Sequence, residues 1–465
     1  MFAQQWNWWP LAINDTTPCA DTLQYHAYVS ALASSGNTAP FVLRANQHGN
    51  IAQTPYSSNF SASIFKRPTC PTRWWDYDFG VQLTGQTNTD PKRNSGDNII
   101  YPTTMITGYF EQLYAHTRLY IVDLTAGIKP MVHGSQARQL SMGGLLFSGN
   151  AHPIPRITIG IDKYIPFPGL FGYLEIKGGL THGWLWEQDT YVTTSNIFVD
   201  NVKLHHKFIG LRVGGRLPVT LAYEMHHAAQ WGGYKNPLLT GERTIDYGNR
   251  LKDFWNVFLF RSGGISQSDQ LNAQGNHIGF QEIALTYKQD SWLVRAYWQS
   301  LFEDMSAAFI GFGMNAADGL WGINIQQDQW PFINQITYEF LNTTSQSGPM
   351  HDKDGLVFAG RDTYYHNSAY PHGWSYFGSI IGNPYIQVNN SRVRAHFVGL
   401  GGDIYGYNYR LMASHVNNYG TYQQPSYSTS TALMLEVSKY IEKAWGLEFS
   451  VALAGDIGTQ YGNQF

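Results

Sequence analysis

The chain has 465 residues, of which 14% are charged and 15% are aromatic, including 30 tyrosines and 15 tryptophans. Soluble domains carry about 25% charged residues, so this composition argues against a set of ordinary soluble domains. The net charge of −3 argues against a nucleic-acid partner, and the sequence contains no run of about 18 apolar residues that would predict a transmembrane helix.

The N-terminal part of the chain predicts export. Residues 1–5 (MFAQQ) fit the tail of a cleaved secretory signal. We therefore expect residues 1–39 to be a signal remnant and a small periplasmic segment, and residues 40–465 to be a second, larger domain. Cys19 and Cys70 are the two cysteines, and in an oxidising compartment such a pair is more often a disulfide than a metal or redox site. Two unrelated buried thiols are the alternative.

Alternation of apolar and polar residues at every second position is the main pattern of residues 40–465. Near the end of the chain, Leu447, Phe449 and Val451 alternate with Glu448 and Ser450. In a strand, these two sets point to opposite faces, one suited to hydrocarbon and the other to a polar lumen. The pattern predicts an all-β fold, a transmembrane antiparallel β-barrel of the bacterial outer membrane.

Segments with this alternation, bounded by turn residues, predict about 18 strands: 40–47, 57–67, 74–87, 104–114, 118–130, 156–162, 171–181, 204–215, 218–229, 277–288, 291–302, 319–326, 332–343, 392–400, 403–416, 430–441, 446–456 and 459–465. Short connections, such as 115–118 and 401–403, alternate with long ones, as expected for periplasmic turns and long outer loops. Residues 251–260 could be a further strand, but an extra strand would move every later short turn to the outer side. We therefore predict a short helix or packed loop there.

Charged residues of both signs are expected to face the lumen: Asp123, Lys129, Glu282, Arg295, Glu339, Arg410, Glu436 and Glu448. Mixed charges neutralise one another, which favours a paired polar network that fills the lumen. A conduit for a substrate is the alternative.

A series of motifs runs from the centre of the chain to its end: LHHKF at 204–208, EMHHAAQWGG at 224–233, GNH at 275–277, FEDMS at 302–306, DGLWG at 318–322, YYHN at 364–367, HGWSY at 372–376, IIGNP at 380–384, and DIG at 456–458 with YGN at 461–463. In this order and spacing, they resemble the capsule assembly protein Wzi family of Bacteroidetes-type bacteria, over roughly residues 40 to 465. The resemblance implies an 18-stranded outer-membrane barrel that acts as a non-enzymatic surface lectin and helps to attach capsular polysaccharide.

Aromatic and polar residues of these motifs are candidates for glycan binding, because flat rings pack against sugar C–H faces while amides and carboxylates bind hydroxyls. The candidates are Gln230, Trp231, Tyr234, Glu303, Asp304, Trp374, Tyr376 and Asn383. Trp184 and Trp186 form a further aromatic pair. The alternative is that the same residues join the outer loops into a lid.

Histidines occur as the adjacent pairs His205-His206 and His226-His227. Neighbours on a strand point to opposite faces, so each pair can give at most one ligand to a common site, whereas a catalytic zinc needs three, with an acid such as Glu224 or Glu303 nearby. We therefore expect no metal and no cofactor. The sequence also carries no nucleophile elbow or phosphate-binding loop, which argues against an enzyme.

A passive channel, or an accessory barrel of a larger uptake or export complex, is the main alternative function, and an outer-membrane hydrolase is a weaker one. The expected partners are capsular or other surface polysaccharide, outer-membrane lipid and other outer-membrane proteins, without nucleic acid.

Overall fold

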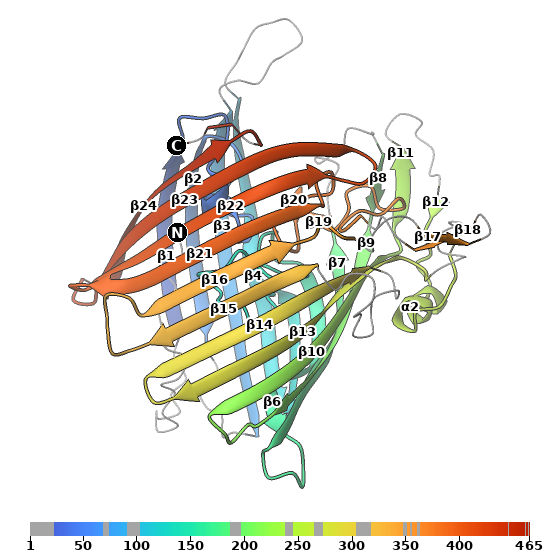
Figure 1. Ribbon diagram of the computed structural model, residues 1–465, viewed down its shortest axis with the longest axis horizontal. Coiled ribbons are helices and arrows are strands. Elements are labelled where there is room, and N and C mark those ends of the chain that lie inside the picture. Colours follow the sequence, from blue (N-terminus) through green and yellow to red (C-terminus); the bar gives the residue numbers. More distant parts are fainter. Residues whose placement is uncertain are drawn as a thin grey trace, which may run out of the picture.

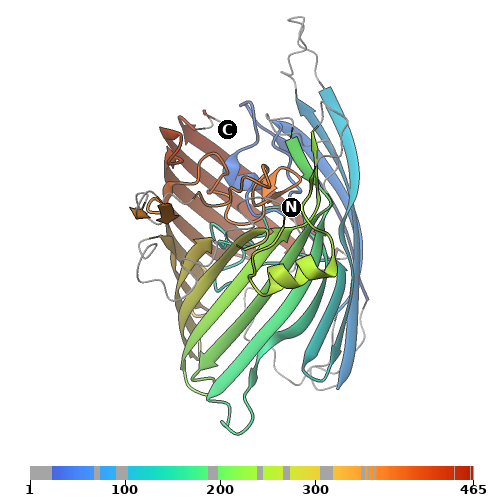
Figure 2. The same cartoon turned by 90° about the vertical axis from the view of Figure 1, so that its right-hand side faces the viewer.

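A computed structural model describes residues 23–465 except for 68–73, 91–102, 187–196, 238–244, 265–272, 304–317, 347–350, 354–355, 360–362, 445, 461 and 464. The described chain is almost entirely β-structure, and one large sheet curls around an interior (Figures 1 and 2). Among the described residues, no helix has both the length and the apolar content needed to cross a membrane.

The large sheet has 17 described strands, and each is antiparallel to the next one along the chain. In order, they are β1 (Leu23–Ala33), β2 (Tyr56–Lys66), β3 (Trp75–Asp90), β4 (Thr103–Leu119), β5 (Val122–Ile128), β6 (Pro155–Pro166), β7 (Leu174–Leu185), β9 (Val202–Val213), β10 (Val219–Trp231), β13 (Asn276–Gln289), β14 (Trp292–Glu303), β15 (Gly319–Gln327), β16 (Gln335–Asn342), β21 (Val393–Ile404), β22 (Tyr407–Gly420), β23 (Pro425–Ile441) and β24 (Leu447–Gly458).

The remaining elements are small and belong to the long connections. One three-stranded sheet and two hairpins are built from β8 (Ile197–Asp200), β11 (Tyr234–Pro237), β12 (Ile245–Asp246), β17 (His351–Lys353), β18 (Leu356–Ala359), β19 (Ser375–Tyr376) and β20 (Ser379–Ile380). The two helices are α1 (Phe41–Arg44) and α2 (Leu251–Phe258).

Short turns lie at one end of the sheet and long connections at the other (Figure 1). Two-residue turns join β4 to β5 and β21 to β22, and Tyr120 and Tyr405 adopt left-handed φ values of 54° and 55° there. The predicted alternation of short and long connections is therefore confirmed. The turns predicted at 115–118 and 401–403 were wrong in position, because the hairpin pairing continues to Leu119 and Ile404.

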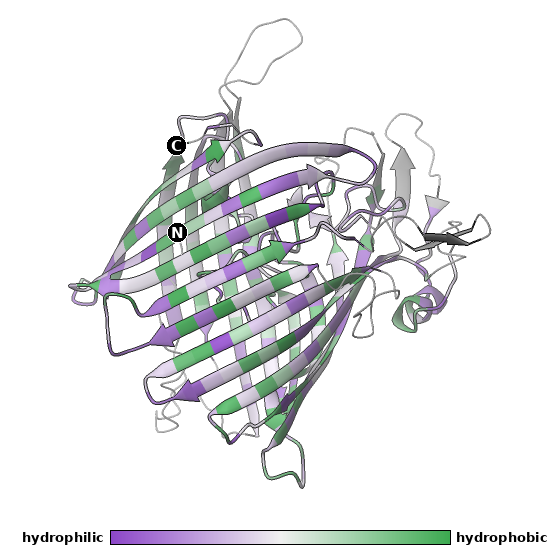
Figure 3. Cartoon of the chain, viewed as in Figure 1, coloured by the Kyte–Doolittle hydropathy of each residue, from purple (hydrophilic) through white to green (hydrophobic). Residues whose placement is uncertain are grey.

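Alternating exposure along the strands confirms the period-two pattern. On β23, Leu433 and Leu435 are 54% and 42% exposed on the outer face, whereas Ala432, Met434 and Glu436 are at most 3% exposed on the inner face. Apolar and polar residues alternate in the same way along neighbouring strands (Figure 3). The outer face of these strands is therefore apolar, and the inner face is packed.

The start of the sheet corrects the prediction. Residues 23–33, which we placed in a periplasmic segment, form strand β1 and pair with β2 along their whole length. The strand predicted at 40–47 was wrong: it contains α1, and the consecutive residues Phe41 and Val42 are both buried, which a two-faced strand does not allow. The Phe41 N–H donates to the Asp456 carboxylate at 2.6 Å, so this segment turns inward. The strand predicted at 459–465 was also wrong, since β24 ends at Gly458 and the next residues form a turn.

Helix α2 confirms the interpretation of residues 251–260. It begins where the Asp253 carboxylate accepts the Arg250 N–H at 2.9 Å. The helix lies outside the large sheet (Figure 2), where Phe254 and Phe258 pack edge-on against His205 with ring centroids 5.8 and 5.4 Å apart. Part of the outer face of β9 is therefore covered by protein.

Candidate functional site

The connection between β5 and β6, residues 129–154, folds into the interior, and we call it the first inward loop. It contains the run Leu140–Phe147, whose apolar side chains are at most 2% exposed. Strand β5 is paired with β4 and β6, yet the loop bonds to β13, β14, β16 and β22, which lie far from β5 in the strand order. The loop therefore crosses the space enclosed by the sheet.

Buried carboxylates and amides of the large sheet, which we call the wall, hold this loop. Glu339 accepts the Ser141 hydroxyl at 2.7 Å and the Met142 N–H at 2.5 Å. Glu282 accepts the Ser135 hydroxyl at 2.5 Å and its N–H at 2.9 Å. Each carboxylate thus satisfies a side-chain donor and a backbone donor that would otherwise be buried without a partner.

Further hydrogen bonds join the first inward loop to other side chains of the wall. Arg410, near the beginning of β22, donates to the Gln139 carbonyl at 3.0 Å and to Glu436 at 2.5 Å. The side chain of Gln299 donates to Gln136 at 2.9 Å. The paired polar network predicted for the lumen is therefore present, and loop residues complete it.

A second inward loop, residues 363–392, packs on the first. The Trp374 indole N–H donates to the Leu146 carbonyl at 2.9 Å, and the Asn383 amide donates to the Gly143 carbonyl at 2.6 Å. Gly382 is required at this contact, because a Cβ there would lie 2.3 Å from the Tyr365 hydroxyl oxygen. The two loops therefore form one packed unit.

The segment 34–55 adds a third layer, and together these three segments are the inward loops. Its Phe41 ring lies edge-on to Tyr385 of the second inward loop, with centroids 4.8 Å apart, and the His48 N–H donates to the Gly149 carbonyl at 2.7 Å. A cavity of about 20 Å³ lies beside the first loop, lined in part by His48 and His152. It has room for about one water molecule.

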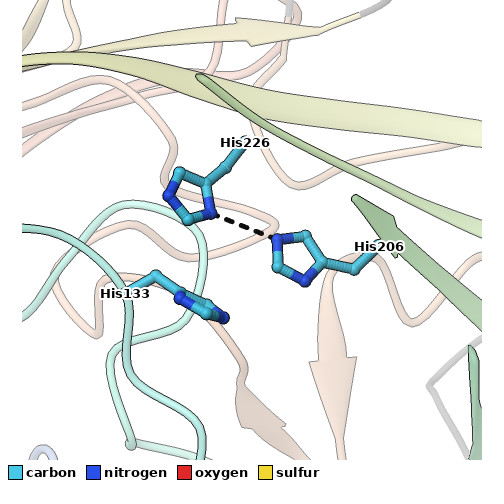
Figure 4. A group of neighbouring side chains, drawn as sticks. All are labelled: His133, His206 and His226. Carbon is cyan, nitrogen blue, oxygen red and sulfur yellow. Dashed lines mark hydrogen bonds between the residues drawn. The ribbon is translucent and has the colours of Figure 1, made fainter. Parts of the chain in front are cut away.

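Three imidazoles meet between the first inward loop and the wall. His133 comes from the loop, His206 from β9 and His226 from β10, and one ring nitrogen of each lies within 4.8 Å of the others (Figure 4). His206 Nε2 and His226 Nδ1 are 3.2 Å apart. Burial keeps the pKa of His133 well below its ordinary value, so this ring is neutral at pH 7. Neutral imidazoles can bind a metal ion.

Other histidines of the same strands face outward. His205 and His227 lie on the opposite face from His206 and His226, and His227 bonds to His277 at 2.9 Å. Phe254 and Phe258 of α2 cover this side. Each adjacent pair therefore gives one ring to the inner cluster, as the sequence predicted, while the third ring comes from a loop that we had not considered as a source of ligands.

The candidate glycan-binding residues fall into three groups. Trp374, Tyr376 and Asn383 belong to the second inward loop and are 0%, 4% and 0% exposed. Gln230 donates to the Gly373 carbonyl at 3.0 Å, and Glu303 accepts the Tyr365 N–H at 2.5 Å. In this arrangement, these five residues hold the second inward loop, and the Trp374 ring contacts protein on all sides.

Trp231 and Tyr234 lie apart from that group. Trp231 is 3% exposed and packs beside Phe254 of α2, with Lys203 Nζ 4.7 Å from its ring centroid. Tyr234 is 38% exposed. The alternation of short and long connections correctly places both near the end with long connections, but it does not show which face of the sheet a ring occupies or what packs on that ring. We expected exposed ring faces on Trp231 and Trp374, but surrounding residues bury both rings.

Some predicted residues cannot be placed. Asp304, Cys19 and Cys70 lie outside the described residues, so the disulfide stays a prediction.

The residues that the sequence reasoning missed are those of the first inward loop. The consecutive apolar residues Leu145, Leu146 and Phe147 are the signal that could have found it, because such a run in a long connection indicates a buried segment.

Comparisons with known proteins give no sequence match and only low structural similarity. No family model and no curated protein matches the sequence. Among solved structures, OccD3 (OpdP) of Pseudomonas aeruginosa aligns with a TM-score of 0.43 and 8% identity, over 96% of this chain and 90% of that chain. OccAB4 of Acinetobacter baumannii gives 0.43 and 9%, over 97% of both chains. A BenF-like porin from Pseudomonas fluorescens Pf-5 gives 0.42 and 10%, over 95% and 96%. Likenesses of this size carry no functional assignment.

Proposed function

We propose that this chain is a non-enzymatic outer-membrane β-barrel with a closed interior, which binds a surface polysaccharide and helps to attach or assemble it at the cell surface. The observation that carries the proposal is the crossing of the interior by the first inward loop, from β5 to Glu282, Glu339 and Arg410. A closed interior favours a role at the outer surface over transport.

The outer face of the sheet supports a membrane location. Strand β24 alone presents five apolar side chains at 47% to 71% exposure: Leu447, Phe449, Val451, Leu453 and Ile457. Exposed apolar rows of this kind are stable in hydrocarbon and costly in water. Strands of 12 to 17 residues, such as β24 and β23, exceed the roughly 9 to 11 residues that a tilted strand needs to cross a bilayer.

Exposed aromatic residues near the long connections offer places for a sugar. Trp186 is 53% exposed and stacks on Trp184 with ring centroids 6.1 Å apart, and Tyr234 is 38% exposed. Ring faces that stay open to solvent can pack against the C–H face of a pyranose. After the burial of Trp231 and Trp374, these residues are the better candidates for the glycan contact.

Conductance tests the closed interior. The full chain, reconstituted in planar bilayers, should show no steady ion current. A variant in which residues 135–148 are replaced by a Gly/Ser linker should conduct, which would demonstrate that the protein inserts and that the loop closes it. Steady ohmic steps of porin size from the unchanged chain would overturn the proposal.

Capsule retention tests the surface role. Replacing Trp186 and Tyr234 together by alanine should release polysaccharide from the cells into the medium, while the barrel still migrates differently on a gel with and without heating. Tyr405→Ala is the matched control, because Tyr405 is 88% exposed at the end with short turns. Equal retention by the double variant and the control would contradict a glycan contact at these rings.

A passive channel is the second candidate, and charged pairs of the inner face favour it. Arg212 pairs with Glu175 at 2.5 Å, and His116 bonds to Asp123 at 3.0 Å. Asp162 is exposed on β6, the strand that pairs with β5, whereas the paired groups are at most about a third exposed. Charges of both signs along an inner face are typical of a channel lining. The conductance measurement above separates this candidate from the first.

A further inference from the structure

The imidazoles of His133, His206 and His226 converge from three separate places in the chain. His133 lies in the first inward loop, and the other two lie on neighbouring inward-facing positions of β9 and β10 (Figure 4). His206 and His226 are fully buried at 0% exposure. Among the described residues, this is the group of histidine, cysteine and acidic side chains whose ligand atoms are close enough to hold a metal ion.

The spacing of the nitrogens fits a tetrahedral ion. Zn–N bonds of about 2.0–2.1 Å place ligand nitrogens roughly 3.3 Å apart. His206 Nε2 and His226 Nδ1 are already 3.2 Å apart. The His133 nitrogen lies within 4.8 Å of both, so metal binding requires this side chain, which comes from a loop rather than a strand, to move closer by at most about 1.5 Å.

Glu224 fixes which ring nitrogen of His226 can bind a metal. Its carboxylate accepts a bond from His226 Nε2 at 3.1 Å, and because a carboxylate is only an acceptor, Nε2 must carry the hydrogen. The lone pair of His226 is then on Nδ1, which points to His206. Lys177 and Tyr164 hold the same carboxylate at 2.6 and 2.9 Å. A carboxylate behind a ligating histidine is the usual second partner in zinc sites.

His206 can present the second lone pair. Without an ion, its Nε2 donates a hydrogen to His226 Nδ1, 3.2 Å away. With a metal on Nε2, the hydrogen moves to Nδ1, and His206 Nε2 and His226 Nδ1 both direct lone pairs to the ion. The buried Nδ1 of His206 has no hydrogen-bond partner among the described residues in either case, so the supporting carboxylate belongs to His226 alone.

We propose that His133, His206 and His226 bind a divalent transition-metal ion, with Zn²⁺ as the best candidate, and that this ion joins the first inward loop to the wall. Three imidazoles suit Zn²⁺, Cu²⁺ or Ni²⁺, whereas Mg²⁺ and Ca²⁺ prefer oxygen ligands. Glu224 is a positioning residue for His226. The competing explanation is aromatic packing alone, since His133 also lies 5.4 Å from the ring centroid of Phe208.

Metal binding by the purified full chain, prepared without a histidine tag, tests the site. After dialysis against excess Zn²⁺ and removal of free ion, the protein should retain about one Zn²⁺ per chain. His133→Ala should weaken binding by more than about 100-fold, because loss of a direct ligand exceeds the 10- to 100-fold effect of a second-layer residue. His152→Ala, in the same loop but outside the cluster, should bind as the unchanged chain does.

Two further measurements separate a metal site from a packing role. Co²⁺ should give the absorption of a four-coordinate ion in the unchanged chain and in His152→Ala, but not in His133→Ala. Glu224→Gln should bind Zn²⁺ 10- to 100-fold more weakly while retaining the heat-dependent gel shift of a folded barrel. Zinc retention by His133→Ala equal to that of the unchanged chain, or no retention by either, would overturn the proposal.

Discussion

The wall strands and the inward loops bury their apolar residues by different rules. In the wall, exposure alternates residue by residue, as between Leu433 and Met434, because strand geometry points neighbours to opposite faces. In the first inward loop, Leu145, Leu146 and Phe147 are buried in succession, at 0–2% exposure. The loop has no periodic backbone, and its position depends on single hydrogen bonds to distant strands. The wall should therefore tolerate changes that the loops do not.

The largest expected effect comes from the tryptophan that joins the two inward loops. Trp374→Ala removes a fully buried ring and its bond to Leu146, which should lower the free energy of unfolding by about 3–5 kcal/mol. Urea unfolding in detergent micelles measures this. Trp186→Ala, which removes an exposed ring, should change it by less than about 0.5 kcal/mol. Equal losses would show that the loops do not form a packed core.

The next effect tests the carboxylate that holds the first inward loop. Glu339→Gln keeps the shape but replaces one acceptor oxygen by an NH₂ group that faces the donors of Ser141, Met142 and Tyr297, so it should cost about 1–3 kcal/mol. The loop should then open more often, which we would measure as faster protease cleavage within 129–154. Glu442→Gln, on an exposed turn, is the control. Unchanged cleavage would show that Glu339 does not fix the loop.

Acid should loosen the inward loops before the wall. Burial lowers the pKa of His152 and of His48 to about 4 in the folded chain, against about 6.5 when unfolded. The unfolded state therefore binds more protons between these values, so the loops lose stability as the pH falls from about 6.5 to about 4. Tryptophan fluorescence should change in this range while the β-sheet signal in circular dichroism stays constant.

A variant identifies the titrating groups. His152→Phe keeps the edge-on contacts with Tyr109 and Phe377 but cannot take up a proton, so it should shift the fluorescence change to lower pH. A midpoint identical to that of the unchanged chain would exclude His152 from the transition.

The smallest effect belongs to the outer face. Leu453→Ala on β24, where the side chain is 71% exposed, should cost less than about 1 kcal/mol, because lipid or detergent fills the space. Leu145→Ala in the first inward loop should cost about 2–5 kcal/mol by leaving a cavity. The same unfolding assay compares the two, and similar costs would remove the distinction between wall and loops.

The wall could be predicted because its two faces follow from period two alone. Leu447, Phe449 and Val451 face outward as the alternation indicates, and the short turns gather at one end as connection lengths indicate. The positions of the inward loops could not be predicted, because the partners of Ser135 and Ser141 lie 147 and 198 residues away in the sequence. The same limit applies to Trp231 and Trp374, which distant segments bury, and to His133, which joins the other two imidazoles only through the fold.

Helix α2 has a consequence for how the molecule sits in a bilayer. It shields the outward imidazoles of β9 and β10 from hydrocarbon, while Leu251, Trp255 and Leu259 on its far side are 73%, 49% and 45% exposed. These three residues recur every four positions and form one apolar stripe. In the membrane location that we propose, this stripe would place α2 at the headgroup boundary. The helix would then contact the bilayer surface on one side of the sheet only.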